Sequence, residues 1–206
     1  NTLSKLTNDI TEIDHHMPDK TDEGVPSPAA GDISDTKKLD LEQTEKVSKE
    51  DWERLSDKFD PKMGDIVYTR FGTIGIAKRV NTKQKFLASY SVALLKPIES
   101  IYTPFFEHAM NSPLLRNQAE RRTRGSANKN LNLGQIKKMR LPFPPLSKQK
   151  DIADRLDSVI DKIQFKGRYL NQLQSFKQGL MQDLLSGKVR TTDVDIDIPE
   201  EVAKYG

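Results

Sequence analysis

The most regular pattern in the chain is a seam of apolar residues that recur every three or four positions between residues 152 and 184. Its members are Ile152, Leu156, Val159, Ile163, Leu170, Leu173, Leu180 and Leu184, and Lys166 and Lys177 occupy the two polar positions in the same register. This alternation is the heptad repeat of a coiled coil. Ser147 suits an N-cap and Gly187 suits a C-terminal stop. We predict a helix over 146–187.

A helix of this kind needs a partner for its seam. From 147 to 185 it would be roughly 58 Å long at 1.5 Å per residue, which is too long to be covered by one small domain. We therefore expect a second helix to pack against it. The alternative is that the seam packs against the rest of its own chain.

The segment just before the helix reads Leu-Pro-Phe-Pro-Pro-Leu over 141–146. Proline fixes its own φ angle and disfavours helix at the preceding residue, so this segment is predicted to be a rigid, extended joint. The joint divides the chain into a domain over 1–145 and the helix over 146–187, with a C-terminal tail over 188–206.

Within 1–145 the hydrophobic pattern predicts a mixed α+β domain. Ile66 to Thr69 and Ile76 to Val80 suit two strands joined by a turn at Gly72 and Gly75, and alternating apolar residues over 86–96 predict a third strand. Residues 1–60 are predicted to hold short strands and loops with one short helix, capped by Ser48, whose Trp52 and Leu55 face inward.

Two further helices begin at dipeptides that suit a helix start. Thr103-Pro104 and Ser112-Pro113 each combine a capping residue with proline in the first turn. The second helix is predicted to run to about Arg121. Residues 121–130 are basic and aperiodic, and are predicted to form a loop.

Charge is distributed very unevenly along the 206 residues, although the formal net charge is only +3. Residues 1–60 carry 8 basic and 16 acidic side chains, whereas residues 112–140 carry 8 basic side chains and 1 acidic one. A concentrated basic surface is typical of proteins that contact phosphate groups. The chain has no cysteine, which fits a reducing cytoplasm, and no apolar run of the length of a membrane span.

The candidate DNA-contacting residues follow from this charge and from the glycine turn. Arginine reads guanine and asparagine reads adenine by paired hydrogen bonds, while lysine and arginine also hold the phosphates. The candidates are Arg70, Thr73, Lys78, Arg79, Arg121, Arg122, Arg124, Asn128 and Lys129. The plainer alternatives are a hairpin turn without ligand contact for Gly72 and Gly75, and a solvated loop for the arginines. Tyr68 and Tyr90 are expected in the core or in cross-strand pairs.

No catalytic constellation accompanies these candidates. His15 and His16 lie between two aspartates without further metal-ligating residues nearby, and Asp19 with Asp35 and Lys37 fits a metal-nuclease pattern only formally, because the surroundings are polar and loop-like. The sequence contains no methyltransferase box and no phosphate-binding Gly-Lys-Ser/Thr loop. We expect no catalytic residue, no metal and no cofactor.

Taken in order, three segments resemble the specificity (S) subunits of type I restriction-modification systems. Residues 64–75 resemble the glycine segment of their target-recognition domains, and residues 125–136 resemble the loop and short helix that end such a domain. Residues 141–149 resemble the Pro-Pro-Leu-x-Glu-Gln entry to a conserved helix, although Lys148 replaces the usual Glu, which leaves a contact at that position in doubt. Leu184 to Val189 resemble the end of that helix.

The resemblance implies a non-catalytic subunit that recognises double-stranded DNA. In this family each domain reads one half of a bipartite site, the paired helices set the gap, modification (methyltransferase) subunits methylate and restriction subunits cleave. This chain would be a half-subunit that pairs with itself, or one half of a longer subunit. Two other functions remain open: the recognition domain of a fused restriction-methyltransferase, and a coiled-coil adaptor that binds only protein.

Overall fold

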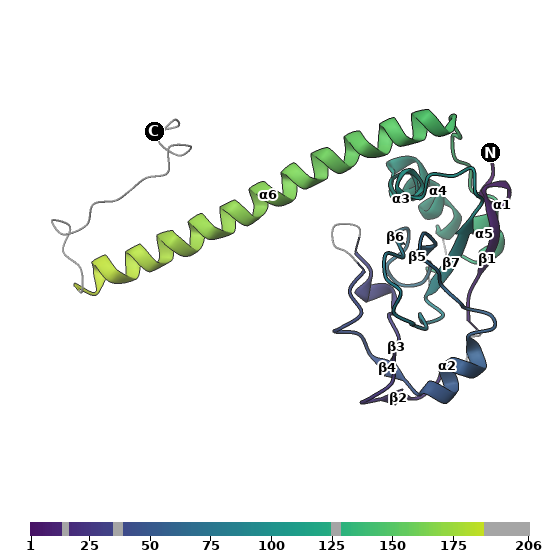
Figure 1. Ribbon diagram of the computed structural model, residues 1–206, viewed down its shortest axis with the longest axis horizontal. Coiled ribbons are helices and arrows are strands. Elements are labelled where there is room, and N and C mark those ends of the chain that lie inside the picture. Colours follow the sequence, from purple (N-terminus) through teal and green to yellow (C-terminus); the bar gives the residue numbers. More distant parts are fainter. Residues whose placement is uncertain (14–16, 35–38, 125–128, 188–206) are drawn as a thin grey trace. The chain divides into compact units, whose positions relative to one another are not determined.

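The computed structural model describes residues 1–13, 17–34, 39–124 and 129–187. The chain divides into two compact units, Asn1–Leu156 and Asp157–Gly206. The first unit holds all the described strands and the shorter described helices, and the long helix α6 begins in it (Figure 1). The second unit is described through Gly187, and its described part is the rest of that helix followed by two residues. The expected combination of a mixed helix-and-strand fold with a long C-terminal helix is confirmed.

The centre of the first unit is a four-stranded antiparallel sheet. Its strands lie in the order β1-β7-β5-β6, so the N-terminal strand pairs with the last one. Their bounds are β1 Thr7–Thr11, β5 Ile66–Thr69, β6 Ala77–Arg79 and β7 Val92–Pro97. β5 and β6 are the two strands predicted around the glycine turn.

Both faces of this sheet are buried, as the strand β5 shows. Ile66 and Tyr68 point into one hydrophobic core and Val67 points into another, and all three side chains are fully buried. This follows from the period of two along a strand, which sends successive side chains to opposite faces. Tyr68 is therefore a core residue, as expected.

Four helices contribute to the core that contains Tyr68. They are α1 Leu3–Leu6, α3 Thr103–Met110, α4 Pro113–Thr123 and α5 Leu133–Lys137. Ser112 caps α4 as predicted, since its hydroxyl accepts the Leu115 N–H. α3 begins one residue earlier than predicted, because Tyr102 rather than Thr103 is its N-cap.

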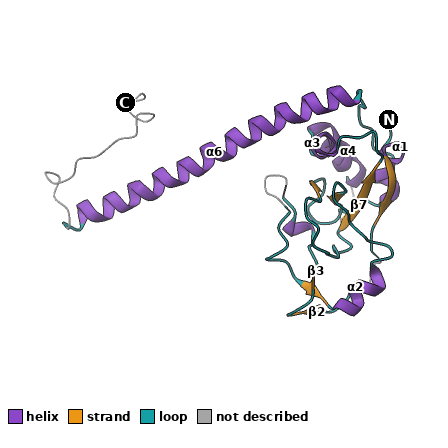
Figure 2. Ribbon diagram, in the orientation of Figure 1, coloured by secondary structure: helices purple, strands orange, loops and turns teal. Residues whose placement is uncertain are grey.

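The core on the other face includes residues from the acidic first third of the chain. A second, three-stranded sheet has the order β2-β4-β3, and the helix α2 carries the predicted Ser48 cap, whose hydroxyl accepts the Asp51 N–H at 3.0 Å. Figure 1 shows this region at the opposite end of the unit from α3 and α4, and Figure 2 shows how much of it is loop. The bounds are β2 Lys20–Thr21, β3 Val25–Pro26, the 3-10 helix η1 Ala30–Asp32, β4 Lys46–Val47 and α2 Lys49–Leu55.

The strand predicted over 86–96 is only half right. β7 begins at Val92, and Phe86, Leu87 and Ala88 are all fully buried instead of alternating. Leu87 and Ser89 donate their N–H groups to the carbonyls of Pro26 and Pro28, at 2.9 Å in both cases. Because proline has no N–H to return, these contacts do not continue as a ladder.

The helix α4 is longer than predicted. It ends at Thr123, so Arg121 and Arg122 are helical and do not belong to a loop. The hydroxyl of Thr123, itself buried, donates to the carbonyl of Ala119 at 3.2 Å. Arg122 donates to the carbonyl of Gln118 at 2.9 Å. These two hydrogen bonds stabilise the last turn of α4. The sequence around residues 121–124 has no hydrophobic periodicity, so it did not predict this turn.

The edge strand β6 is closed by a side chain. Asn111 accepts the N–H of Ala77 at 3.0 Å and donates to the carbonyl of the same residue at 2.8 Å. The asparagine amide thus occupies the hydrogen-bonding positions that a further strand would use.

The predicted long helix is confirmed as α6, Leu146–Leu185, 40 residues in length. It begins at Leu146, so Ser147 lies inside its first turn and is not the cap. Gln149, fully buried, accepts the Tyr102 N–H at 2.9 Å and donates to the Pro144 carbonyl at 2.9 Å, which anchors the first turn to the domain. Gly187 has a φ of 70°, as suits a helix stop. Within the described residues, no helix is both long and apolar enough to cross a membrane.

Candidate nucleic-acid interface

A glycine loop connects β5 to β6 and forms one side of the candidate site. Gly72 and Gly75 have φ angles of 73° and 92°, in the left-handed region that favours glycine. Thr69 fixes the base of the loop, because its carbonyl accepts the Gly75 N–H at 3.0 Å and its hydroxyl accepts the Ile76 N–H at 2.9 Å. The predicted candidate Thr73 lies between the two glycines and is exposed.

Arg70 is not on the surface, which corrects its assignment as a DNA contact. Its side chain is 2% exposed. The guanidinium donates to the carbonyls of Leu131 and Tyr90 at 3.1 and 2.6 Å, and to Oδ1 of Asn130 at 3.0 Å. Its Nη1 also lies 2.5 Å from the carboxylate of Glu12. With its donors engaged inside the protein, Arg70 is a structural cation that ties the glycine loop to the segment after residue 128.

Lys78 and Arg79 on β6 are partly neutralised by one carboxylate. Glu107 on α3 lies 2.9 Å from Lys78 Nζ and 3.5 Å from Arg79 Nε. The Lys78 side chain is 14% exposed and that of Arg79 is 37% exposed. A phosphate that approached these two candidates would have to compete with Glu107, so they are weaker candidates than their charge alone suggests.

The end of α4 carries the most accessible of the predicted cations. Arg121 and Arg124 are exposed, as is Lys129 at the start of the next described segment. Arg122 is only half-exposed, because its guanidinium donates to the carbonyls of Gln118 and Lys138. Asn128 lies outside the described residues.

The glycine loop and the end of α4 meet around one hollow, which we call the basic hollow. Its volume is about 270 Å³, and its lining consists of Gly72, Ile74, Glu120, Thr123, Arg124 and Lys129. Asn130 pairs with Phe71 in an antiparallel bridge, and the Leu131 N–H donates to the Arg70 carbonyl at 2.8 Å. Two segments that the sequence singled out separately are therefore one surface.

Glu120 is a lining residue that the sequence reasoning missed. Its carboxylate is exposed among cations, and it forms no ion pair with any cation in the described part of the chain. An acid beside DNA is repelled by phosphates, but it can accept hydrogen bonds from the amino group of cytosine. A helix that continues to residue 123 places Glu120 one turn before Arg124, on the same side. Because a loop was predicted from residue 121, this proximity was not inferred.

Further exposed cations lie beside α4 and were also missed. Lys137, Lys138 and Arg140 are exposed. Gln118 on α4 accepts the Arg140 N–H at 2.8 Å and donates to the Arg140 carbonyl at 2.8 Å, which fixes this segment against the helix. The basic surface therefore continues from the hollow along α4.

The predicted seam on α6 is exposed in the single chain. Val159, Ile163 and Leu170 are 54%, 65% and 54% exposed. Phe165 and Phe176 are exposed to a similar extent but do not belong to the seam. At 100° per residue these two lie on nearly the same face, roughly 100° around the helix from the seam. The helix thus has two unequal apolar stripes.

The residues considered for metal chemistry do not form a site in the described chain. Within the described ranges there is no group of three or more His, Asp or Glu that could hold a metal ion. His15 and His16, and the Asp35 and Lys37 of the nuclease-like pattern, lie outside those ranges.

Comparison with known proteins gives consistent similarities. A family profile described as "Type I restriction modification DNA specificity domain" matches residues 27–175. The chain is 24% identical over 140 residues to the specificity subunit of the type I restriction enzyme EcoKI from Escherichia coli K12, covering 65% of this chain and 30% of that protein. It is 35% identical over 66 residues to the putative type I restriction enzyme MjaX specificity subunit of Methanocaldococcus jannaschii, covering 32% of this chain and 16% of that protein.

Solved structures share the fold. The HsdS subunit from Thermoanaerobacter tengcongensis superposes with a TM-score of 0.58 at 16% identity, covering 89% of this chain and 43% of that one. The type I restriction-modification S subunit from M. genitalium gives a TM-score of 0.53 at 17% identity, covering 85% and 43%. The chain spans less than half the length of each of these relatives.

Proposed function

The chain belongs to the family of type I restriction-modification DNA specificity domains, and from that premise we propose that it recognises one half of a bipartite sequence in double-stranded DNA. It does so as a specificity subunit or half-subunit that docks a methyltransferase subunit. The observation that carries this proposal is the basic hollow, where the glycine loop and the end of α4 meet. In such an assembly it acts in the cytoplasm.

The basic hollow combines the two kinds of group that sequence-specific recognition requires. Arg124 and Lys129 supply positive charge for phosphates, which sets the position of the protein on the duplex. Glu120 and Thr73 supply acceptors and donors that suit the edges of bases. Gly72 has no side chain, and nothing lies within 4 Å of the position that its Cβ would occupy, so the backbone there is open to a ligand.

The exposed seam on α6 supports pairing with a second helix. The partner is a second copy of this chain or a second domain-helix unit of a longer subunit. Two recognition domains joined in this way would read two half-sites, and the helix pair would set the gap between them. Lys166 and Lys177 occupy seam positions, and polar residues at such positions fix the register of a coiled coil at some cost in stability.

The second apolar stripe of α6 supports a further protein contact. Phe165 and Phe176 are 59% and 58% exposed and lie outside the seam, so a helix bound to the seam leaves much of their surface open. We assign this stripe to the methyltransferase subunit. That subunit supplies the methylation chemistry and restriction subunits supply cleavage, while the chain itself contributes recognition without catalysis or cofactor.

The test combines a binding measurement with a sequence readout. In cells that contain the methyltransferase subunit, expression of this chain should add a methylated bipartite motif to the genome, detected by methylation-sensitive sequencing, and deletion of the chain should remove it. A motif that stays unchanged on deletion would contradict the proposal.

The binding arm uses the full chain together with the methyltransferase subunit and a duplex library, at low and at high salt. Phosphate contacts should make the affinity fall steeply as salt rises. A protein-only adaptor would bind no DNA under either condition. A recognition domain from a fused restriction-methyltransferase would bind DNA but would not direct the separate methyltransferase subunit, so its expression would add no methylated motif.

A further inference from the structure

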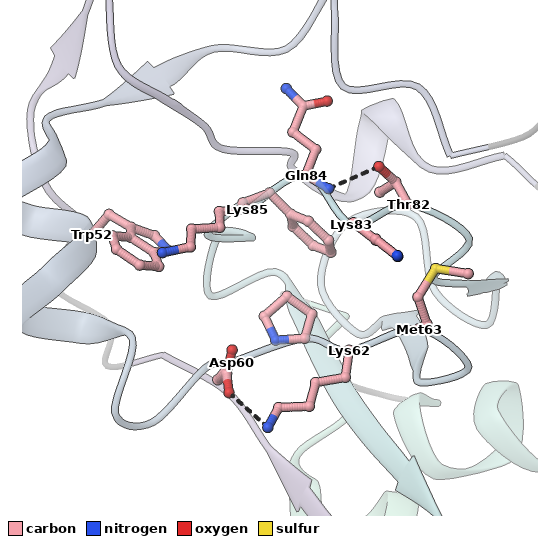
Figure 3. A pocket seen from close by; sticks show the side chains of 10 residues that line it. Trp52, Asp60, Lys62, Met63, Thr82, Lys83, Gln84 and Lys85 are labelled. Atoms are coloured by element: carbon pink, nitrogen blue, oxygen red, sulfur yellow. Dashed lines mark hydrogen bonds and ion pairs between the residues drawn. The ribbon is translucent and has the colours of Figure 1, made fainter.

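A second pocket lies at the other end of the β5–β6 hairpin from the glycine loop. Ile66 at the start of β5 pairs with Arg79 at the end of β6, so the residues before 66 and after 79 continue beyond that end. The pocket has a volume of about 260 Å³ and is formed by three segments, namely Trp52 of α2, residues 60–63 and residues 82–86 (Figure 3). It is separate from the basic hollow and shares no lining residue with it.

The pocket carries an excess of positive charge. Its lining includes Lys62, Lys83 and Lys85 but only one carboxylate, that of Asp60, which lies 3.4 Å from Lys62 Nζ. Lys83 and Lys85 are exposed, and within the described chain no carboxylate lies at ion-pair distance from either. Two ammonium groups at one concave site therefore have no carboxylate partner among the described residues.

One of these ammonium groups is held in place. Lys85 Nζ lies 4.2 Å from the centre of the Trp52 ring, and Figure 3 shows its side chain directed at the indole while Lys62 turns to Asp60. A cation over an aromatic face is attracted by the ring quadrupole. The loop that carries Lys85 is also fixed, since the Gln84 N–H donates to the Thr82 hydroxyl at 3.0 Å. A cation fixed in advance loses less freedom when a ligand binds.

The lining also includes the apolar side chains of Trp52, Pro61, Met63 and Phe86, beside the polar Thr82 and Gln84. Trp52 and Pro61 are half-buried and Met63 is exposed, so these three side chains offer apolar surface to a ligand, whereas Phe86 is fully buried. An anion alone would use the lysines and leave this surface uncovered. A ligand that joins an anionic group to a flat or ring-shaped body would use both.

We infer that this pocket binds a phosphate group together with the sugar or base attached to it. Lysine is a point-charge donor well suited to phosphate. The two uncompensated cations match the charge of a phosphate monoester, about −1.5 to −2 at neutral pH, or that of two neighbouring phosphodiesters. The phosphate can come from the DNA backbone or from a free nucleotide, and both present the same chemistry to Lys83 and Lys85. This inference does not depend on base recognition at the basic hollow.

Trp52 makes the inference directly measurable, because it is the only tryptophan in the chain. A phosphate that binds Lys85 beside the indole changes the charge next to the ring and should change the fluorescence of Trp52. The full chain is titrated at constant ionic strength with deoxyadenosine 5′-monophosphate, with inorganic phosphate, with deoxyadenosine and with a short duplex. We expect a saturable change with the monophosphate or the duplex and none with deoxyadenosine, which lacks the charge.

Charge reversal at Lys83 provides the matched comparison, because this lysine lines the pocket without being the cation held on the indole. Lys83→Glu should weaken the response at least tenfold, the size expected for removing one charge-assisted hydrogen bond. Lys5→Glu, at an exposed lysine on α1, changes the net charge equally and should leave the response unaltered. Circular dichroism of both variants checks that they are folded.

The four ligands separate the possible outcomes, and inorganic phosphate, which lacks the sugar and base, should act more weakly than the monophosphate. A response to the duplex that Lys83→Glu removes identifies the DNA backbone as the source, and a response to the monophosphate alone identifies a free nucleotide. The inference is overturned if neither changes Trp52 emission, if deoxyadenosine acts as well as its phosphate, or if a glutamate-rich peptide competes equally. Duplex binding seen by anisotropy of labelled DNA without any Trp52 response would leave the proposed function standing and remove only this pocket.

Discussion

Arg70 donates from Nη2 to Oδ1 of Asn130 at 3.0 Å, and this hydrogen bond joins the end of β5 to the segment that follows residue 128. The same guanidinium reaches the carbonyls of Leu131 and Tyr90. The Arg70 side chain therefore holds the loop with Gly72 beside the segment with Lys129, together with the Phe71–Asn130 bridge. A surface that reads DNA needs its groups held in place before the ligand arrives, and Arg70 supplies that support from the interior.

Replacing Arg70 should destabilise the domain strongly. Arg70→Met would remove the cation beside Glu12 and the donor to two carbonyls and to the Asn130 side chain, at a cost of about 3 kcal/mol or more. Urea unfolding followed by circular dichroism measures the change. Arg124→Met, at an exposed position, should shift stability by less than about 0.5 kcal/mol. Equal unfolding midpoints for the two variants would show that Arg70 is not the structural cation described above.

Exposed cations around the basic hollow should act by neutralising phosphates. Arg121→Ala and Arg124→Ala should each weaken duplex binding, and the removal of one phosphate-binding cation should reduce the slope of log affinity against log salt by about 0.9. Fluorescence anisotropy at several salt concentrations gives the slope. Lys5→Ala removes an exposed charge from α1 and should leave the slope unchanged. An unchanged slope in both arginine variants would place the DNA elsewhere.

Glu120 should affect which bases are preferred more than how tightly DNA is held. Glu120→Gln removes a negative charge among cations, so non-specific affinity should rise slightly, while preference for a base with an exposed amino group should fall about tenfold. Selection from a randomised duplex library followed by sequencing reads both effects. Glu50→Gln, an exposed acid on α2, is the control. If the Glu120 variant selects the same motif as the unmodified chain, the carboxylate does not take part in base recognition.

Pairing through α6 should depend on the seam. Ile163→Glu places a charge in the middle of the apolar stripe and should shift the isolated chain from dimer to monomer, without changing the unfolding of the domain, because Ile163 is 65% exposed in the single chain. Sedimentation equilibrium measures the mass. Ser175→Glu, on the opposite side of the helix, should leave the mass unaltered. A wild-type chain that is monomeric at all concentrations would instead favour a second unit within a longer subunit.

The long helix was predictable because its information is local. The spacing of Ile152, Leu156 and the other seam residues indicates a helix directly. The prolines at 142, 144 and 145 indicate that the helix cannot extend into the preceding segment. The Ser48 and Ser112 caps were predictable for the same reason. Each of these signals lies within a few residues of the structure that it specifies.

The site was less predictable because its contacts are long-range. A cation next to a glycine turn looks like a ligand contact, and nothing local indicates that Arg70 turns inward to Asn130, 60 residues away. The end of α4 was placed too early because side-chain to backbone bonds of Arg122 and Thr123 hold a turn that the sequence presents as loop. Glu120 was not selected from the sequence because its role rests on lining the same hollow as Gly72, and the sequence does not show that long-range proximity.

The asparagine that closes β6 has a consequence for how this protein behaves when it is concentrated. An open edge strand templates aggregation, because any extended chain can add to it. Asn111 already satisfies both backbone groups of Ala77, so growth of a cross-β aggregate from that position is blocked. A strand that adds to this edge of the sheet would first have to displace the Asn111 amide.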